Sequence, residues 1–229
     1  MASLQDFREK LAQNANRAFT EYVLIIDEMS LDYATGEDGT LVQDEFKVVT
    51  VVFEYSGPNV ITMRAKRESD EGGRQISYLP WKNAHAGGIS QARLTGDGPQ
   101  YFSTSQLTGC RFTIQYDDAS RQTATVLHLA GDVQGEKKPE GSATRDGLEQ
   151  NALSPQAKPT LKRSYSIGQM KSAKFKEMGV ATGTKLYYDG GKAAIFGYRK
   201  KSGAWTFYAA EQKFGLGAGL VNLTTLSRV

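Results

Sequence analysis

The chain has 229 residues and a mass of 25.1 kDa, which suits one medium domain with its own hydrophobic core. Apolar residues make up 39% and charged residues 23%, so the composition predicts a folded protein and excludes full disorder. The formal net charge of +3 is too small to favour direct binding to nucleic acid.

Cysteine usage and the apolar runs exclude further classes. Cys110 is the single cysteine, which excludes an intramolecular disulfide and a zinc site built from several thiolates. The longest apolar run, 22–26, is far shorter than the roughly 20 residues that cross a bilayer, so we expect no membrane insertion. The segment MASLQDFREK lacks an apolar signal core, which predicts synthesis in a cytoplasm.

The N-terminal half predicts one helix followed by strands. Apolar residues recur at helical spacing over 4–19, and Ser3 is a candidate N-cap. After residue 20 the composition becomes typical of strands separated by turn signals. The strand-forming runs are 21–29, 45–55, 59–67 and 75–81.

The C-terminal half begins with a polar stretch. Residues 132–163 hold almost no large apolar groups, which predicts a flexible insertion in a single domain that covers 1–229. Beyond it the pattern predicts a short helix and three strands, and a glycine-rich loop over 215–219 in place of a dinucleotide site. The helix is expected at 166–178, and the strands at 185–188, 193–199 and 205–209.

The central run 101–131 contains the residues with chemistry. A hairpin with its turn at 117–121 would pair Tyr116 with Gln122 and Cys110 with His128, on one side of the sheet. Directly opposed residues have Cβ atoms about 4.5 to 5.5 Å apart, which is within working range of a thiol and an imidazole. Asp117 and Asp118 are interpreted as turn residues.

Such a pair would make Cys110 an accessible, activated thiol. A thiolate attacks carbonyl carbons, and a neighbouring imidazole can stabilise it and protonate the leaving group. Gly109 permits a close approach of the main chain, so the Cys110 N–H is a candidate oxyanion donor. The alternative is that Cys110 packs as a small hydrophobe and His128 is a satisfied structural group.

Two motifs carry a family resemblance over about 78–131. YLPWK at 78–82, followed by LTGC at 107–110, resembles the Burkholderia lethal factor type of glutamine deamidase toxin, which has Leu-Pro-Trp-Lys before Leu-Ser-Gly-Cys and a histidine on a following strand. The cytotoxic necrotizing factor catalytic domain has a similar motif. The residues matching this motif are Leu107, Thr108, Gly109 and Cys110, with threonine in place of serine.

The resemblance implies roles for two further residues. His128 takes the place of the family histidine. Thr104 falls where the family has a threonine whose main-chain carbonyl orients that histidine. Trp81 is interpreted as a packing residue, Lys82 as a solvated strand end and His85 as a solvated loop residue, so all three stay outside the expected site.

The resemblance also implies a fold and an activity. The fold would be α+β, with a β-sandwich of mixed sheets surrounded by helices and loops. The activity would be hydrolysis of a glutamine side-chain amide in a host protein through a Cys110 thioester, with no metal or organic cofactor. The likeness implies a toxin or effector that is made in a bacterial cytoplasm, is secreted and acts as a monomer in the host cytosol. A translation-initiation RNA helicase is the favoured target and a Rho GTPase the second.

Other functions use similar residues. A non-catalytic protein-binding module could share the fold and keep Cys110 for packing. A cysteine hydrolase of peptide bonds and a chemoreceptor-type deamidase both use a cysteine and histidine pair. Ammonia release without chain cleavage would separate the toxin-like activity from the binding module and the peptide-bond hydrolase.

Overall fold

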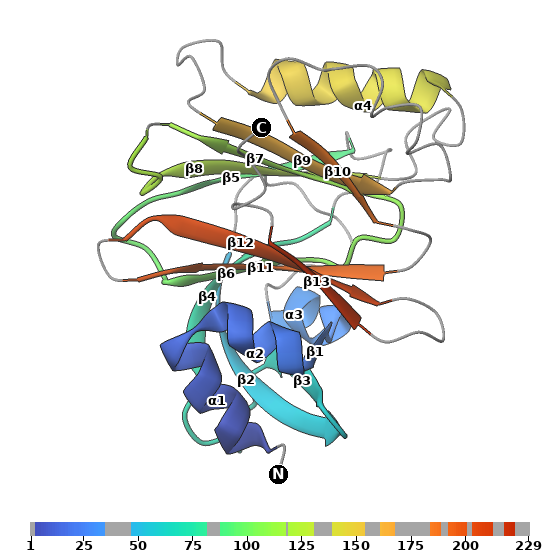
Figure 1. Ribbon diagram of the computed structural model, residues 1–229. Coiled ribbons are helices and arrows are strands. Elements are labelled where there is room, and N and C mark those ends of the chain that lie inside the picture. Colours follow the sequence, from blue (N-terminus) through green and yellow to red (C-terminus); the bar gives the residue numbers. More distant parts are fainter. Residues whose placement is uncertain are drawn as a thin grey trace.

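The computed structural model describes residues 3–34, 47–81, 88–117, 119–130, 139–153, 161–167, 184–188, 192–200, 203–212 and 218–222. In these residues two β-sheets stack face to face, and helices cover both outer faces (Figure 1). The structure therefore confirms the predicted α+β fold built on a β-sandwich.

The described strands form a larger and a smaller sheet. The larger sheet has the order β1 (Val23–Ile26), β3 (Val60–Ala65), β2 (Lys47–Gly57), β4 (Arg74–Leu79), β6 (Tyr101–Thr104), β11 (Lys192–Arg199), β12 (Trp205–Gln212) and β13 (Ala218–Asn222). The smaller sheet has the order β10 (Thr184–Tyr188), β9 (Leu161–Ile167), β7 (Arg111–Tyr116), β8 (Ala124–Leu129) and β5 (Ile89–Leu94).

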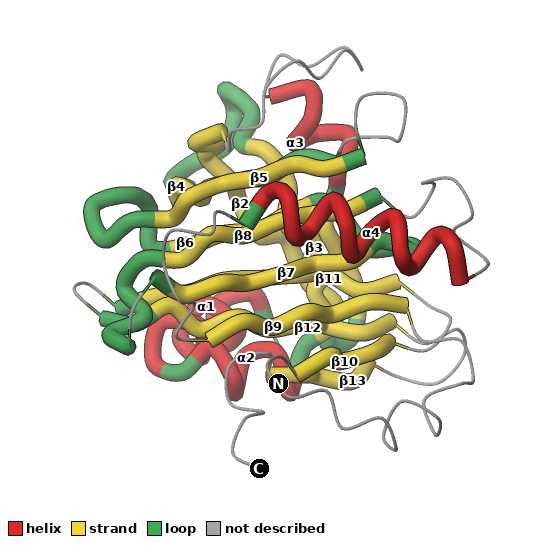
Figure 2. The backbone as a smooth tube through the Cα atoms, turned by 90° about the horizontal axis from the view of Figure 1, so that it is seen from above, coloured by secondary structure: helices red, strands yellow, loops and turns green. Residues whose placement is uncertain are grey.

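Helices form the outer layers. Figure 1 shows α1 (Leu4–Gln13), α2 (Ala15–Glu21) and α3 (Glu28–Ala34) against the larger sheet. Figure 2 shows α4 (Pro139–Ala152) over the opposite face of the sandwich, above β7 and β8 of the smaller sheet. The smaller sheet is thus covered on both faces, which explains why β7 is buried along its whole length.

The core between the sheets is aromatic. Alternate residues of β7 and β8 point toward the larger sheet, as the period of two requires. The ring of Phe102 lies 5.8 Å from that of Phe112 and 5.9 Å from that of Phe207, measured between centroids. Gly197 leaves room for this cluster, because a Cβ there would lie 2.8 Å from Phe207. Burial of each ring contributes about 1.5 to 3 kcal/mol.

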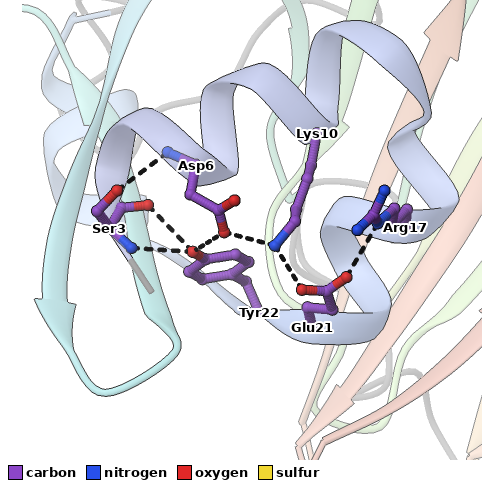
Figure 3. A network of polar contacts seen from close by, with 6 residues as sticks. All are labelled: Ser3, Asp6, Lys10, Arg17, Glu21 and Tyr22. Carbon is purple, nitrogen blue, oxygen red and sulfur yellow. Dashed lines mark hydrogen bonds and ion pairs between the residues drawn. The ribbon is translucent and has the colours of Figure 1, made fainter. Parts of the chain in front are cut away.

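A polar network fixes the first two helices. Figure 3 shows the Tyr22 hydroxyl at the end of α2 accepting from the Ser3 N–H at 3.0 Å and contacting the Asp6 carboxylate at 2.6 Å. Lys10 lies 2.5 Å from both Asp6 and Glu21, so it joins α1 to α2. These hydrogen bonds and the nearby ammonium lower the pKa of Asp6.

The helix predicted over 4–19 is two helices. Asn14 separates them, because its side chain accepts from the Arg17 N–H at 3.4 Å and caps α2. The strand predicted over 21–29 is also shorter than expected. It ends at Ile26, and Asp27 caps α3 by accepting from the Ser30 N–H at 3.2 Å. Capping side chains therefore end a helix and a strand at positions where the apolar pattern of the sequence continues.

The prediction of a flexible insertion over 132–163 is wrong for the described part of it. Residues 139–152 form α4, and residues 161–163 begin β9. The helix is held by ion pairs from Arg111 on β7, at 2.5 Å to Asp146 and 2.8 Å to Glu149. Composition did not predict this helix, because the polar contacts that anchor it are not visible in a count of apolar residues.

The remaining C-terminal predictions have mixed outcomes. The strands predicted at 185–188, 193–199 and 205–209 are confirmed, as they lie within β10, β11 and β12. Of the helix predicted at 166–178, the first two residues lie in β9 and the others fall outside the described residues. The glycine-rich segment 215–219 is described only at 218–219, which open β13.

Candidate functional site

The segment LTGC carries the chain from the larger sheet to the smaller one. Leu107 is fully buried and exchanges two main-chain hydrogen bonds with Ala193 on β11, at 2.8 and 3.0 Å. Gly109 has a φ of +122°, which residues with a Cβ rarely adopt. Thr108 is exposed, and Cys110 directly precedes β7. The motif therefore acts as an anchored turn that delivers Cys110 to the smaller sheet.

The observed hairpin register differs from the predicted one by two residues. Tyr116 pairs with Ala124, and Phe112, not Cys110, pairs with His128. Seven residues, 117–123, lie between these paired positions in place of the predicted five, and the Asp117 N–H bonds across them to the Thr123 carbonyl. A shift of two keeps every side chain on its predicted face.

Cys110 and His128 are consequently diagonal neighbours on the face toward the larger sheet. Cβ atoms in such a diagonal relation are about 7 Å apart. In the described part of the chain, Nε2 of His128 makes no hydrogen bond. The direct pairing predicted from the sequence is wrong, although both residues reach the same end of the same sheet.

Thr104 holds the histidine ring through its side chain. Its hydroxyl oxygen lies 2.8 Å from Nδ1 of His128 and 2.6 Å from the carbonyl oxygen of Leu79. A carbonyl only accepts, so the hydroxyl proton goes to Leu79 and the hydroxyl oxygen accepts from His128. This assigns the tautomer with the proton on Nδ1 and a lone pair on Nε2. The prediction that Thr104 acts through its main-chain carbonyl is therefore wrong.

Burial keeps His128 neutral. The side chain is 0% exposed, and this desolvation lowers its pKa from 6.5 to about 3. At neutral pH the ring is thus a base with its free lone pair on Nε2. Its neighbours across the sheet are Phe112 on β7 and Ser90 on β5. Burial disfavours the imidazolium, so Nε2 can accept a proton from a thiol only after the site has opened to solvent.

Cys110 is also covered. Only 5% of its surface is exposed, so the prediction of an accessible thiol is wrong for this conformation. One surface hollow lies beside Arg74 and Tyr101, and another beside Tyr198, and neither is lined by Cys110. A substrate can reach the sulfur only after the groups that cover it have moved.

The other sequence candidates are placed as follows. Trp81 follows β4 and keeps 38% of its surface exposed, so it is a weaker packing residue than expected. Asp117 directly follows β7 in the hairpin turn, as its interpretation as a turn residue requires, and it pairs with Arg93 at 2.8 Å. Lys82, His85 and Asp118 lie outside the described residues.

Sequence reasoning missed the groups that hold the Nδ1 side of the His128 ring. The Leu79 carbonyl and the Thr104 hydroxyl act together, but they come from different strands of the larger sheet. Tyr78 and Ser105 lie directly beside them in the chain and are buried. The signal was weak: hydroxyl residues cluster at 103–105, one residue before the LTGC motif.

Comparison with protein-family models and with curated proteins finds no match to this chain. No helix in the described ranges is long and apolar enough to span a membrane. Among the described side chains, no group of three or more His, Cys, Asp or Glu residues is arranged to hold a metal ion.

Proposed function

We propose that this protein is a protein-glutamine deamidase, a toxin or effector that converts a glutamine of a host protein to glutamate and ammonia. The observation that carries the proposal is the histidine geometry. The Thr104 hydroxyl fixes the proton of His128 on Nδ1, and Cys110 lies on the same sheet face as the free Nε2. This is the protonation state that a general base for a thiol needs.

The reaction then runs in two balanced stages. Nε2 of His128 takes the proton of the Cys110 thiol, and the sulfur attacks the side-chain amide carbon of glutamine. The imidazolium returns the proton to the nitrogen, the C–N bond breaks, and ammonia leaves a thioester. Water then gives a proton to Nε2 and its oxygen to the carbonyl carbon, the C–S bond breaks, and the sulfur regains a proton. The Cys110 N–H as oxyanion donor stays a prediction.

The motif resemblance supplies the substrate class. It favours a host translation-initiation RNA helicase as the target, with a Rho GTPase second. Purified proteins of both classes should be incubated with the wild-type chain, and ammonia release and glutamine-to-glutamate conversion measured by peptide mass spectrometry. Conversion without chain cleavage, absent in Cys110→Ser and His128→Ala, is the expected result. Conversion retained in Cys110→Ser would overturn the proposal.

The burial of both side chains favours a second candidate. A non-catalytic protein-binding module on this fold would keep Cys110 at 5% and His128 at 0% exposure for packing alone. Such a protein would bind a target without releasing ammonia. The reactivity of the Cys110 thiol in the folded protein distinguishes the two functions.

A further inference from the structure

A second hydrogen-bond chain reaches the same strand ends from the helix side of the larger sheet. The Tyr78 hydroxyl on β4 lies 3.1 Å from Oδ1 of Asp32 on α3 and 2.9 Å from Oγ of Ser105. The main-chain nitrogen of Trp81 lies 2.8 Å from the same Oγ. Tyr78 and Ser105 are 0% and 2% exposed. Buried hydroxyls of this kind are costly to leave without partners.

The direction of this chain follows from its two ends. The Trp81 N–H can only donate, so Ser105 accepts there. Burial raises the pKa of Tyr78 well above its ordinary value, so the phenol keeps its proton. The Tyr78 hydroxyl donates to Oδ1 of Asp32, so it receives the Ser105 proton in turn. Protons therefore point from Trp81 through Ser105 and Tyr78 toward α3.

The two hydrogen-bond chains use consecutive residues of the same two strands. Strands β4 and β6 run parallel, and Leu79 pairs with Thr104. Leu79 belongs to the core between the sheets, whereas Tyr78 belongs to the core under the helices. The contact between Tyr78 and Ser105 therefore holds the strand ends from the helix side of the larger sheet. These strand ends present the Leu79 carbonyl and the Thr104 hydroxyl on the other side, toward the histidine.

Helix α3 holds the next residue as well. The carboxylate of Glu28 accepts a hydrogen bond from the Gln106 N–H. Glu28 and Asp32 are one helical turn apart, so a single helix contacts Gln106 directly and reaches Ser105 through the Tyr78 hydroxyl. Two successive residues after Thr104 are thus linked to α3, Ser105 by its side chain through Tyr78 and Gln106 by its main chain.

We propose that Asp32, Tyr78 and Ser105 are positioning residues, which keep the Thr104 hydroxyl where it accepts the Nδ1 proton of His128. The effect on turnover rests on the proposed function, but the effect on the histidine does not. The hydrogen bonds that carry this role join the three side chains to one another and to the Trp81 N–H. They act through the main chain of β6.

The first test reads the histidine directly. Tyr78→Phe keeps the ring but removes the hydroxyl, and NMR of protein with isotopically labelled histidine reports the ring N–H of His128. We expect this signal to shift or to lose its protection from solvent exchange. Tyr116→Phe is the matched control, because its buried hydroxyl donates to the Trp205 carbonyl at the other end of β7. An unchanged His128 signal in Tyr78→Phe would overturn the proposal.

Further variants keep the test decisive if Tyr78→Phe folds poorly. Ser105→Ala should produce the same change in the histidine signal. Asp32→Asn retains an acceptor oxygen and should preserve the wild-type signal, whereas Asp32→Leu should not. If Asp32→Leu and Asp32→Asn both gave the wild-type His128 signal, this result would contradict the positioning role.

Kinetics separate this proposal from the proposed function. On a deamidated target, Tyr78→Phe should lower kcat about tenfold or more with little change in KM, because misplacement of the base affects the chemical step. If wild-type protein deamidates no target while Tyr78→Phe still alters the His128 signal, the proposed function fails and the positioning role stands. If turnover is normal in Tyr78→Phe, the positioning role fails.

Discussion

Thr104 and His128 join the two sheets through a side-chain hydrogen bond of 2.8 Å, from the end of β6 to β8. The bond sets the histidine tautomer because the Thr104 hydroxyl already donates to Leu79. One buried threonine therefore decides which ring nitrogen of His128 carries the proton. In the proposed reaction Thr104 would act through the histidine and need not touch substrate.

Replacing this hydroxyl should affect both stability and the histidine. Thr104→Val keeps the shape but leaves the Nδ1 proton of His128 without its acceptor, which costs about 1 to 3 kcal/mol. Thr104→Ser keeps the hydroxyl and should lose far less. Chemical denaturation measures the first effect, and glutamine conversion should fall in Thr104→Val only. Equal behaviour of the two variants would return the role to the main-chain carbonyl.

His128 should make stability depend on pH in a definite direction. Its pKa is about 3 in the folded protein and 6.5 ordinarily, so between these values the unfolded chain binds a proton that the folded chain excludes. Stability therefore falls as the pH falls through this window, by up to about 1.4 kcal/mol per pH unit. The free energy of unfolding, measured by chemical denaturation over a series of pH values, should show this slope in wild type and lose it in His128→Gln. His85→Gln serves as the control, and a wild-type slope in His128→Gln contradicts the argument.

The sequence predicts the face of the hairpin better than its register. Alternation in β7 and β8 places Cys110 and His128 on the same side because any even shift preserves it. The turn length sets the register, and a distant segment of the chain contacts this turn. The Trp205 N–H donates to the Arg121 carbonyl in the turn, at 2.8 Å, and no local pattern signals that contact.

The polar parts of the fold were harder to predict. Helix α4 has few large apolar residues, and its anchor is Arg111, which comes from a strand that precedes it in the chain. The hydroxyl of Thr104 likewise meets a carbonyl from β4 and a ring from β8. Composition and spacing describe one segment at a time, whereas these contacts join segments that are distant in the sequence.

The buried ion pair under α4 should be important for stability. Glu149 is 3% exposed and Asp146 is 49% exposed in their side chains, and both contact Arg111. Glu149→Gln removes the buried carboxylate that pairs with the buried Arg111 guanidinium. It should lower the free energy of unfolding by about 3 to 5 kcal/mol. Asp146→Asn should cost about 1 kcal/mol or less. Thermal denaturation compares the two, and equal losses would show that burial does not decide the effect.

Gly197 tests the packing of the aromatic core. A Cβ at this position would lie 2.8 Å from Cε1 of Phe207 and 3.0 Å from Cβ of Phe102. Gly197→Ala should therefore destabilise the protein by about 1 to 3 kcal/mol. Gly57→Ala is the control, because a Cβ there meets nothing within 4 Å. Urea denaturation should show a lower midpoint for Gly197→Ala alone, and two unchanged midpoints would mean that the core has spare room.

The reactivity of Cys110 decides between the enzyme and the binding module. The thiol is 5% exposed, so alkylation by iodoacetamide requires an opening of the folded protein. A catalytic cysteine needs a local opening, and the alkylation rate at low urea should then exceed the rate allowed by global unfolding. His128→Ala should slow this reaction about tenfold or more at neutral pH, because no neutral imidazole remains to take the thiol proton. Intact-mass measurement follows the reaction, since the chain has one cysteine. Two results together would assign Cys110 to packing alone. The alkylation rate would follow global unfolding, and wild type and His128→Ala would react at equal rates when urea is used to match their stabilities.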